Sequence, residues 1–320
     1  MTMAALEPTT DQDIAAVLGT ELAQADFVLA TIAPVLGHLL ANHDNSLFSD
    51  EVVARVQGMV QNVANQILVV HGSNVGAADP RQFAVERETR LAGEIAADEA
   101  LLLHCHALAV ESQLTQRLHD SGALDPVLSP LLQSLVASDD AQVAESAMGL
   151  LAAQARFIET QRRMELPLRE LTGELFHKAL VAFVETFGPE DGAAVERSVD
   201  ALRAGFDEGA SRIGLLARIV TGMGAGARAA LAIHHAGTAL FLTALALATG
   251  QDRPLAVLAT NDRQLARLAL MLRAAGLQPQ EVEEQFLYLH PDIALPDGFE
   301  TLRADQAGAM LAASCGFGGS

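Results

Sequence analysis

The sequence predicts an all-α protein, built as an irregular array of stacked helical hairpins in the style of HEAT repeats. Half of the 320 residues are hydrophobic, mostly Ala and Leu, and the chain has no Trp and a single Tyr. Strands favour β-branched and aromatic residues, so this composition favours helices. Apolar residues also recur at three- and four-residue spacings, the helical period, and no sustained alternation with hairpin turns interrupts them.

The N-terminal part is expected to hold two helices after a polar tail at 1–12. The first helix spans 13–42, with a break near Pro34 because proline lacks the backbone donor. The second follows Ser49, whose hydroxyl suits an N-cap, and starts with two acidic residues where the helix dipole favours carboxylates. We expect both helices to pack within the chain, with homodimerisation or partner docking as the alternative.

The middle of the chain is expected to contain longer helices. The linker HGSNVGAADP at 71–80 precedes one long helix over 81–119, and Gly122 is a natural left-handed stop for it. An amphipathic helix capped by the polar cluster at 138–140 then runs to 161–164, where the chain reads QRRM.

The second half continues the helical pattern. Apolar stripes predict helices on both sides of the FGPEDG break at 187–192. GMGAG at 222–226 is expected to be a flexible turn, since no strand precedes it and no phosphate-binding Lys follows. Residues 229–249 lack charged side chains, but their clean apolar run is half a membrane span, which favours a buried core helix. Asn261 is expected to cap a Leu/Ala-rich helix that closes at Gly276.

These elements suggest a division of the chain into four parts. We expect a disordered tail at 1–12, an N-terminal helical region at 13–165, a C-terminal helical region at 166–313 packed against it, and a disordered tail at 314–320.

Two stretches, at 127–180 and 238–286, carry a family resemblance. The second is the more telling, with an apolar helix, a short helix, a polar cap and a Leu/Ala helix that ends in RAAGL. Together they resemble an uncharacterised all-helical bacterial family, domain of unknown function 2336, over about 122–286. The resemblance implies a HEAT-like helical structure in a bacterial protein, and it implies no catalytic residue.

The net charge of −20 argues against a general nucleic-acid role, because backbone binding needs a basic face. The charge is uneven, since 211–280 holds seven arginines and only two aspartates. A solvated helix face is one interpretation, and contact with an acidic partner is the other. Near Pro167, the arginines of QRRM either cap a helix or touch such a partner. The candidate partner or anion contacts are Arg162, Arg163, Arg218, Arg228, Arg263 and Arg267.

No residue pattern indicates a metal, a cofactor or a nucleophile. His104 and His106 flank Cys105, but on one helix they point about 200° apart and cannot chelate one ion. Cys105 is expected to be a small buried apolar group, and it lies too far from Cys315 to suggest a disulfide framework. Together with the lack of a basic, apolar leader, this predicts a cytoplasmic protein without a membrane span.

Three hypotheses on function stay open. The favoured one is a non-enzymatic protein-binding or scaffold protein with a regulatory role, because helical arrays offer extended surfaces and no catalytic motif is present. The second is an enzyme or small-molecule sensor whose pocket between helices contains several of His104, His106, His234 and His235. The third is an anion contact through the arginines of 211–280, which would have to converge on one face.

Overall fold

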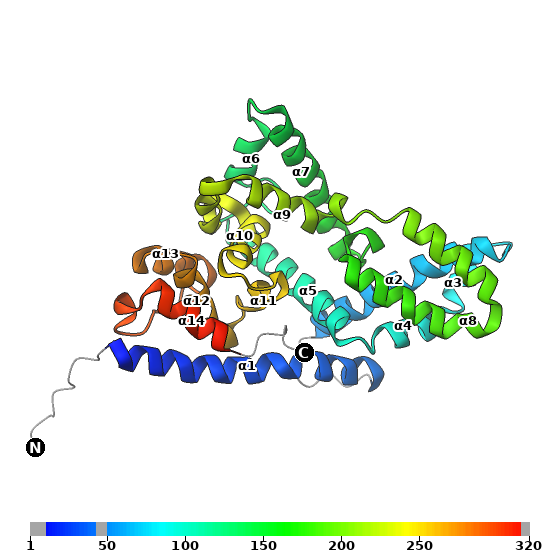
Figure 1. Ribbon diagram of the computed structural model, residues 1–320, viewed down its shortest axis with the longest axis horizontal. Coiled ribbons are helices and arrows are strands. Elements are labelled where there is room, and N and C mark those ends of the chain that lie inside the picture. Colours follow the sequence, from blue (N-terminus) through cyan, green and yellow to red (C-terminus); the bar gives the residue numbers. More distant parts are fainter. Residues whose placement is uncertain (1–10, 43–49, 315–320) are drawn as a thin grey trace, which may run out of the picture.

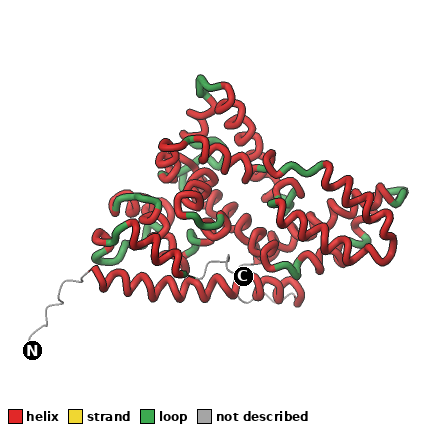
Figure 2. Tube along the Cα trace, in the orientation of Figure 1, coloured by secondary structure: helices red, strands yellow, loops and turns green. Residues whose placement is uncertain are grey.

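The computed structural model describes residues 11–42 and 50–314, and within these ranges it consists of helices and turns without a β-strand (Figures 1 and 2). The predicted all-α fold is therefore confirmed, whereas the HEAT-like style stays a prediction. The α-helices are α1 (Asp11–Asn42), α2 (Asp50–Asn74), α3 (Pro80–Val85), α4 (Glu88–Ile95), α5 (Glu99–Asp120), α6 (Pro130–Val136), α7 (Ala141–Arg162), α8 (Gly173–Ala204), α9 (Arg212–Gly222), α10 (Ile233–Thr249), α11 (Arg253–Leu258), α12 (Leu265–Ala274), α13 (Pro279–Leu289) and α14 (Ala304–Ala313). The short 3-10 helices are η1 (Leu168–Glu170), η2 (Glu208–Ala210), η3 (Gly224–Leu231), η4 (Asp262–Gln264) and η5 (Phe299–Thr301).

Most of the two expected tails lies outside the described residues, as do Ser49 and Cys315. At the N-terminal end, residues 11 and 12 already belong to α1. At the C-terminal end, the hydroxyl of Ser314 donates to the Leu311 carbonyl at 2.8 Å.

Helix α1 lies along one side of the molecule, where it contacts α5, α12 and α2 (Figure 1). Its buried face includes Ile14, Leu18, Leu22 and Leu29, at the spacing of an amphipathic helix. The expected break at Pro34 was wrong, because α1 continues through it to Asn42. The apolar face stays buried beyond the proline, and this packing outweighs the one lost backbone hydrogen bond.

The long helix expected over 81–119 was also wrong, because the chain forms α3, α4 and α5 there. Asp98 ends the uninterrupted pattern, since its carboxylate accepts a hydrogen bond from the Leu101 amide at 2.8 Å and caps α5. Such a side chain offers the backbone an alternative to helix continuation. Gly122 follows α5 with a φ of +72°, as expected for a left-handed stop.

Helix α10 is the buried core helix expected over 229–249, and Phe241 in it is fully buried. It bends at Gly237, where φ is +74° and an added Cβ would lie 2.9 Å from the Ser129 Cβ. The preceding GMGAG segment contributes to the 3-10 helix η3, so the flexible turn expected there was wrong.

Two apolar cores hold the helices together. One centres on α10 and α12 and the other on α2 and α8. Helix α5 enters both, with Leu114 in the first core and Leu101 in the second. Each core draws residues from both sides of the boundary expected between 165 and 166.

One described helix is long and apolar enough to cross a membrane, over Ile14–Leu40 of α1. A single helix of this kind is weak evidence, because the core helix of a soluble protein and a signal sequence near the N-terminus pass the same test. The sharply bent pair of η3 and α10 passes only if both are counted as one span. The absence of a membrane span and the cytoplasmic location therefore stay predictions.

Candidate functional site

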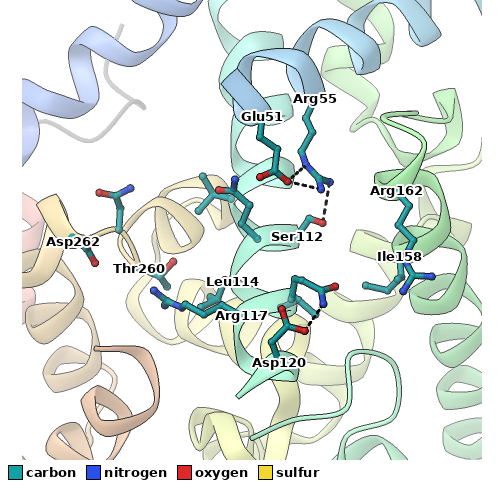
Figure 3. Close-up of a pocket in the computed structure, with 15 residues that line it drawn as sticks. Glu51, Arg55, Ser112, Leu114, Arg117, Asp120, Ile158, Arg162, Thr260 and Asp262 are labelled. Carbon is teal, nitrogen blue, oxygen red and sulfur yellow. Dashed lines mark hydrogen bonds and ion pairs between the residues drawn. The ribbon is translucent and has the colours of Figure 1, made fainter. Parts of the chain in front are cut away.

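A polar cleft of about 570 Å³ runs along the C-terminal half of α5, the helix at the centre of the molecule (Figure 1). Its walls come from the start of α2, the end of α7 and the segment between α11 and η4. Figure 3 shows Ile158 and Arg162 on one side, and Thr260 and Asp262 on the opposite side. The cleft is therefore built from segments that are distant in the sequence.

Charges of both signs line the cleft. Arg55 donates to the Glu51 carboxylate at 2.8 Å and to the Gln161 carbonyl at 2.9 Å. Arg117 donates to the Leu289 carbonyl at 2.9 Å. These contacts fix two guanidinium groups, so the cleft is pre-formed. Its charged residues are Glu51, Arg55, Arg117, Asp120, Arg162 and Asp262.

The two opposing walls present accessible charges. The side chain of Arg162 is 65% exposed, and within the ranges that the structure describes its ion pair is with Glu159 on its own helix, at 3.5 Å. The side chain of Asp262 is 85% exposed and lies 3.1 Å from Nδ1 of His290. Burial lowers the pKa of His290 although Asp262 opposes this, so the ring is largely neutral at pH 7 and leaves the carboxylate charge uncompensated. A guanidinium and a carboxylate therefore face the cleft from opposite sides.

The buried side of α5 carries an ionic cluster of Glu111, Arg212 and Arg253. Arg212 donates to the two Glu111 oxygens at 2.8 and 2.9 Å, and Arg253 donates to the same oxygens at 2.9 and 2.7 Å. The three side chains are 0%, 1% and 11% exposed. Burial alone would raise the pKa of Glu111, but the two guanidinium groups outweigh it and hold this pKa well below its usual range.

Neighbouring side chains fix the positions of the two arginines. The Arg212 guanidinium lies 3.6 Å from the centre of the Phe157 ring and donates to the Gln154 amide oxygen at 3.1 Å. Arg253 donates from Nε to the Thr243 hydroxyl at 3.0 Å. The cluster thereby links α5, α7, α9, α10 and the start of α11.

Sequence reasoning missed this cluster, although one signal for it was present. Glu111 lies four positions after Ala107 and three before Leu114, and both of these are buried in the first core. A carboxylate on the core-facing side of a helix needs a cationic partner. The pattern does not show which arginine supplies it, because both partners come from distant parts of the chain.

The four histidines considered for a pocket do not share one environment. His104 is buried, and burial with repulsion from Arg253 and Arg212 lowers its pKa to about 4. His234 is exposed and stacks on Tyr288 at 5.5 Å between ring centres. His104 and His234 therefore do not form a site in which histidines face each other. Across the described part of the chain, no three His, Cys, Asp or Glu side chains gather closely enough to hold a metal ion.

A buried serine–histidine contact lies in the second core. Nδ1 of His71 lies 3.1 Å from the Ser198 hydroxyl, which donates to the Ala194 carbonyl at 2.7 Å. The imidazole is surrounded by aromatic rings, among them Phe83 and Phe183. Ser198 is fully buried, so this contact contributes to packing and is closed to a substrate.

The structure places the six predicted contact arginines in separate surroundings. Arg162 and Arg163 both pair with Glu159, and of the six only Arg162 lines the cleft. The prediction that Arg267 contacts a partner is corrected by the structure, because its guanidinium is fully buried and pairs with Asp26. A core position for this long side chain follows from its place on the buried face of α12.

The remaining three lie apart from the cleft. Arg228 donates to the Glu281 carboxylate at 2.6 and 2.9 Å, Arg218 donates to the Gly209 carbonyl at 2.7 Å, and Arg263 is exposed.

Comparison of the chain with protein-family models, curated proteins and solved structures finds no match. The resemblance to domain of unknown function 2336 therefore stays a prediction.

Proposed function

We propose that this chain is a non-enzymatic protein-binding protein, and that the cleft along α5 holds an extended polypeptide segment with charges of both signs. The observation that carries the proposal is the placement of Arg162 and Asp262 on opposite walls of a pre-formed polar cleft, with both side chains largely exposed. An acidic residue of the partner would meet Arg162, and a basic residue would meet Asp262.

The lining of the cleft supports binding in preference to catalysis. Among the described residues that form it there is no histidine and no cysteine, the side chains that most often supply acid–base or nucleophilic chemistry. The net charge of −20 would attract a partner with basic character over distance, while the opposed charges in the cleft would set its direction. We also propose that the protein resides in the bacterial cytoplasm and that it belongs to the family it resembles, domain of unknown function 2336.

Charge reversal on each wall tests the proposal, and the chain offers a matched control for each. Affinity capture of the tagged full-length chain from its native cells is compared for Arg162→Glu and Asp262→Arg, with Arg163→Glu and Asp297→Arg as controls. Arg163 is 67% exposed and pairs with the same Glu159, and Asp297 is exposed, but neither lines the cleft. We expect one protein to be retained by both controls and lost with both cleft variants. Retention by all four, or equal loss with the controls, would contradict the cleft as the binding site.

A further inference from the structure

A second cavity, of about 460 Å³, is formed by other residues, between α5, the start of α8, α9 and the start of α11. Its wall is mostly apolar, with Leu103, Leu108, Leu175, Ile213 and Leu255 among the lining side chains. A few polar groups interrupt that wall. Small-molecule sites have this combination of an apolar enclosure and a small number of orienting polar groups.

The Glu111 cluster leaves positive charge beside this cavity. Two guanidinium groups share one carboxylate, so the buried cluster has a net charge of +1. Arg253 lines the cavity and uses three of its five N–H donors on Glu111 and Thr243. In the part of the chain that the structure describes, no hydrogen bond accounts for the other two. A buried excess charge is costly, so an anion beside Arg253 would be stabilised.

His104 also lines the cavity and lacks a hydrogen bond at Nε2, although the residue is only 4% exposed. The Glu170 carbonyl accepts a hydrogen bond from the imidazole. In the neutral ring one nitrogen is a donor and the other an acceptor, so Nε2 is left to accept a hydrogen bond. Buried polar atoms normally have a partner. Nε2 is closed to solvent in this structure, so the ring has to turn slightly toward the cavity for a ligand hydroxyl to supply one.

The lining also holds two carboxylates, Glu174 and Asp252, and both side chains are exposed, so water screens their charge more than that of the buried cluster. Glu174 lies 3.3 Å from Lys178 and is 76% exposed. Asp252 precedes Arg253 in the chain and also faces the cavity. Its single carboxylate would repel a dianion more than a monoanion, which favours a ligand with one negative charge.

We infer that this cavity binds a hydroxylated monocarboxylic acid with an apolar body. The carboxylate would meet Arg253, the hydroxyl would donate to Nε2 of His104, and the hydrocarbon part would lie against the leucines. This ligand site is separate from the cleft, so either proposal can fail while the other stands.

Isothermal titration calorimetry on the full-length chain tests the inference with three probes: 3-hydroxyoctanoate, octanoate and octylamine. We expect both acids to bind, the hydroxy acid more tightly, and the amine to show no binding, because an ammonium group cannot accept hydrogen bonds from the remaining N–H groups of Arg253 and is repelled by this guanidinium. Lack of binding by both acids, or equal binding of octylamine, would overturn the inference.

Two variants locate the site. Ala100 is an exposed residue of α5 that lines the cavity, so Ala100→Phe fills it with little effect on the core. We expect at least about tenfold weaker binding, the factor that corresponds to about 1.4 kcal/mol. Ala152→Phe is the matched control on an exposed position of α7 and should bind as the unmodified chain does. Unchanged affinity in Ala100→Phe contradicts the site.

His104→Phe tests the hydroxyl contact. This variant keeps a flat aromatic ring, although a larger one, and removes both ring nitrogens, so 3-hydroxyoctanoate should bind no more tightly than octanoate. If the preference for the hydroxy acid persists in this variant, His104 does not recognise the hydroxyl and that part of the inference is wrong. Circular dichroism of each variant shows whether the helical fold is kept.

Discussion

Replacing Glu111 by Gln removes the one negative charge of the buried cluster while it keeps nearly the same volume. The carboxylate accepts four hydrogen bonds from Arg212 and Arg253, between 2.7 and 2.9 Å long. An amide has one acceptor oxygen, and its NH₂ group would face the N–H donors of both guanidinium groups. Two cations then stay buried without a counter-charge.

Loss of one partner from a buried ion pair costs about 3–5 kcal/mol, because the remaining charge is uncompensated. With an m-value of about 3 kcal/mol per M for a chain of this size, the urea midpoint should fall by about 1–2 M. Urea unfolding followed by circular dichroism at 222 nm measures this shift. The control is the triple variant Glu111→Leu, Arg212→Met, Arg253→Met, in which the cluster has no charged side chain left.

Replacement of a whole buried ionic cluster by apolar residues is often neutral or stabilising. The triple variant should therefore recover most of the midpoint that Glu111→Gln loses. A midpoint for Glu111→Gln within about 0.3 M of the unmodified chain, about 1 kcal/mol at that m-value, would refute the reasoning. It would mean that the guanidinium groups find water or another anion at little cost.

Three further predictions concern single side chains. The pKa of His104 falls from 6.5 to about 4 on folding, so the unfolded state binds more protons between these two values. The free energy of unfolding should therefore fall as the pH drops from about 6.5 to 4. In His104→Phe that decrease should be smaller, and an identical pH profile would contradict the low pKa of His104. Gly58→Ala would place a Cβ 2.7 Å from the Met164 Cβ and should destabilise the folded protein by about 1–3 kcal/mol. Gly93→Ala, where the added Cβ meets open space, should stabilise the folded protein by up to about 1 kcal/mol. Thermal midpoints that rise in both variants would be inconsistent with the contact at Gly58. Cys105 is fully buried and burial raises the pKa of its thiol to about 12, so peptide mapping should find it unmodified by iodoacetamide at pH 8 until urea unfolds the chain, and rapid alkylation of the folded protein would argue against its burial.

The helical class was predictable because it depends on local physics. Spacings of three and four between apolar residues, as in α1, are visible in the sequence and correspond to buried faces in the structure. The stop at Gly276 was equally local, since Gly276 has a φ of +92°. The cap at Asn261 was placed one element too late, because Asn261 accepts from the Arg263 amide at 3.0 Å and caps η4, and α12 begins only after η4. The division of 81–119 into three helices was not foreseen, because apolar periodicity continues across the turn at Asp98.

The candidate sites were predictable only in part, because they depend on contacts between distant residues. Arg162 was a candidate from its place in QRRM, yet its opposing partner in the cleft, Asp262, lies 100 positions away. Arg267 shows the opposite limit. Its pairing with Asp26 across 241 positions makes it a core residue, which local charge counting had assigned to a surface.

Glu111 was predictable in one respect only. A local pattern in the sequence reveals its burial, whereas residues distant in the sequence neutralise its charge. Leucine and alanine faces are similar to one another, so apolar burial alone allows neighbouring helices to slide with modest loss of contact area. A carboxylate that must meet one guanidinium 101 positions away and another 142 positions away tolerates no such shift, because a displacement of one helical turn, about 5.4 Å, breaks all four hydrogen bonds. The cluster thus sets the register of α9 and α11 against α5, and through α5 it sets the floor of the cleft and the wall of the apolar cavity. The triple variant separates these roles: if it keeps its stability but loses binding of the captured partner, the cluster positions the helices for function more than it stabilises them.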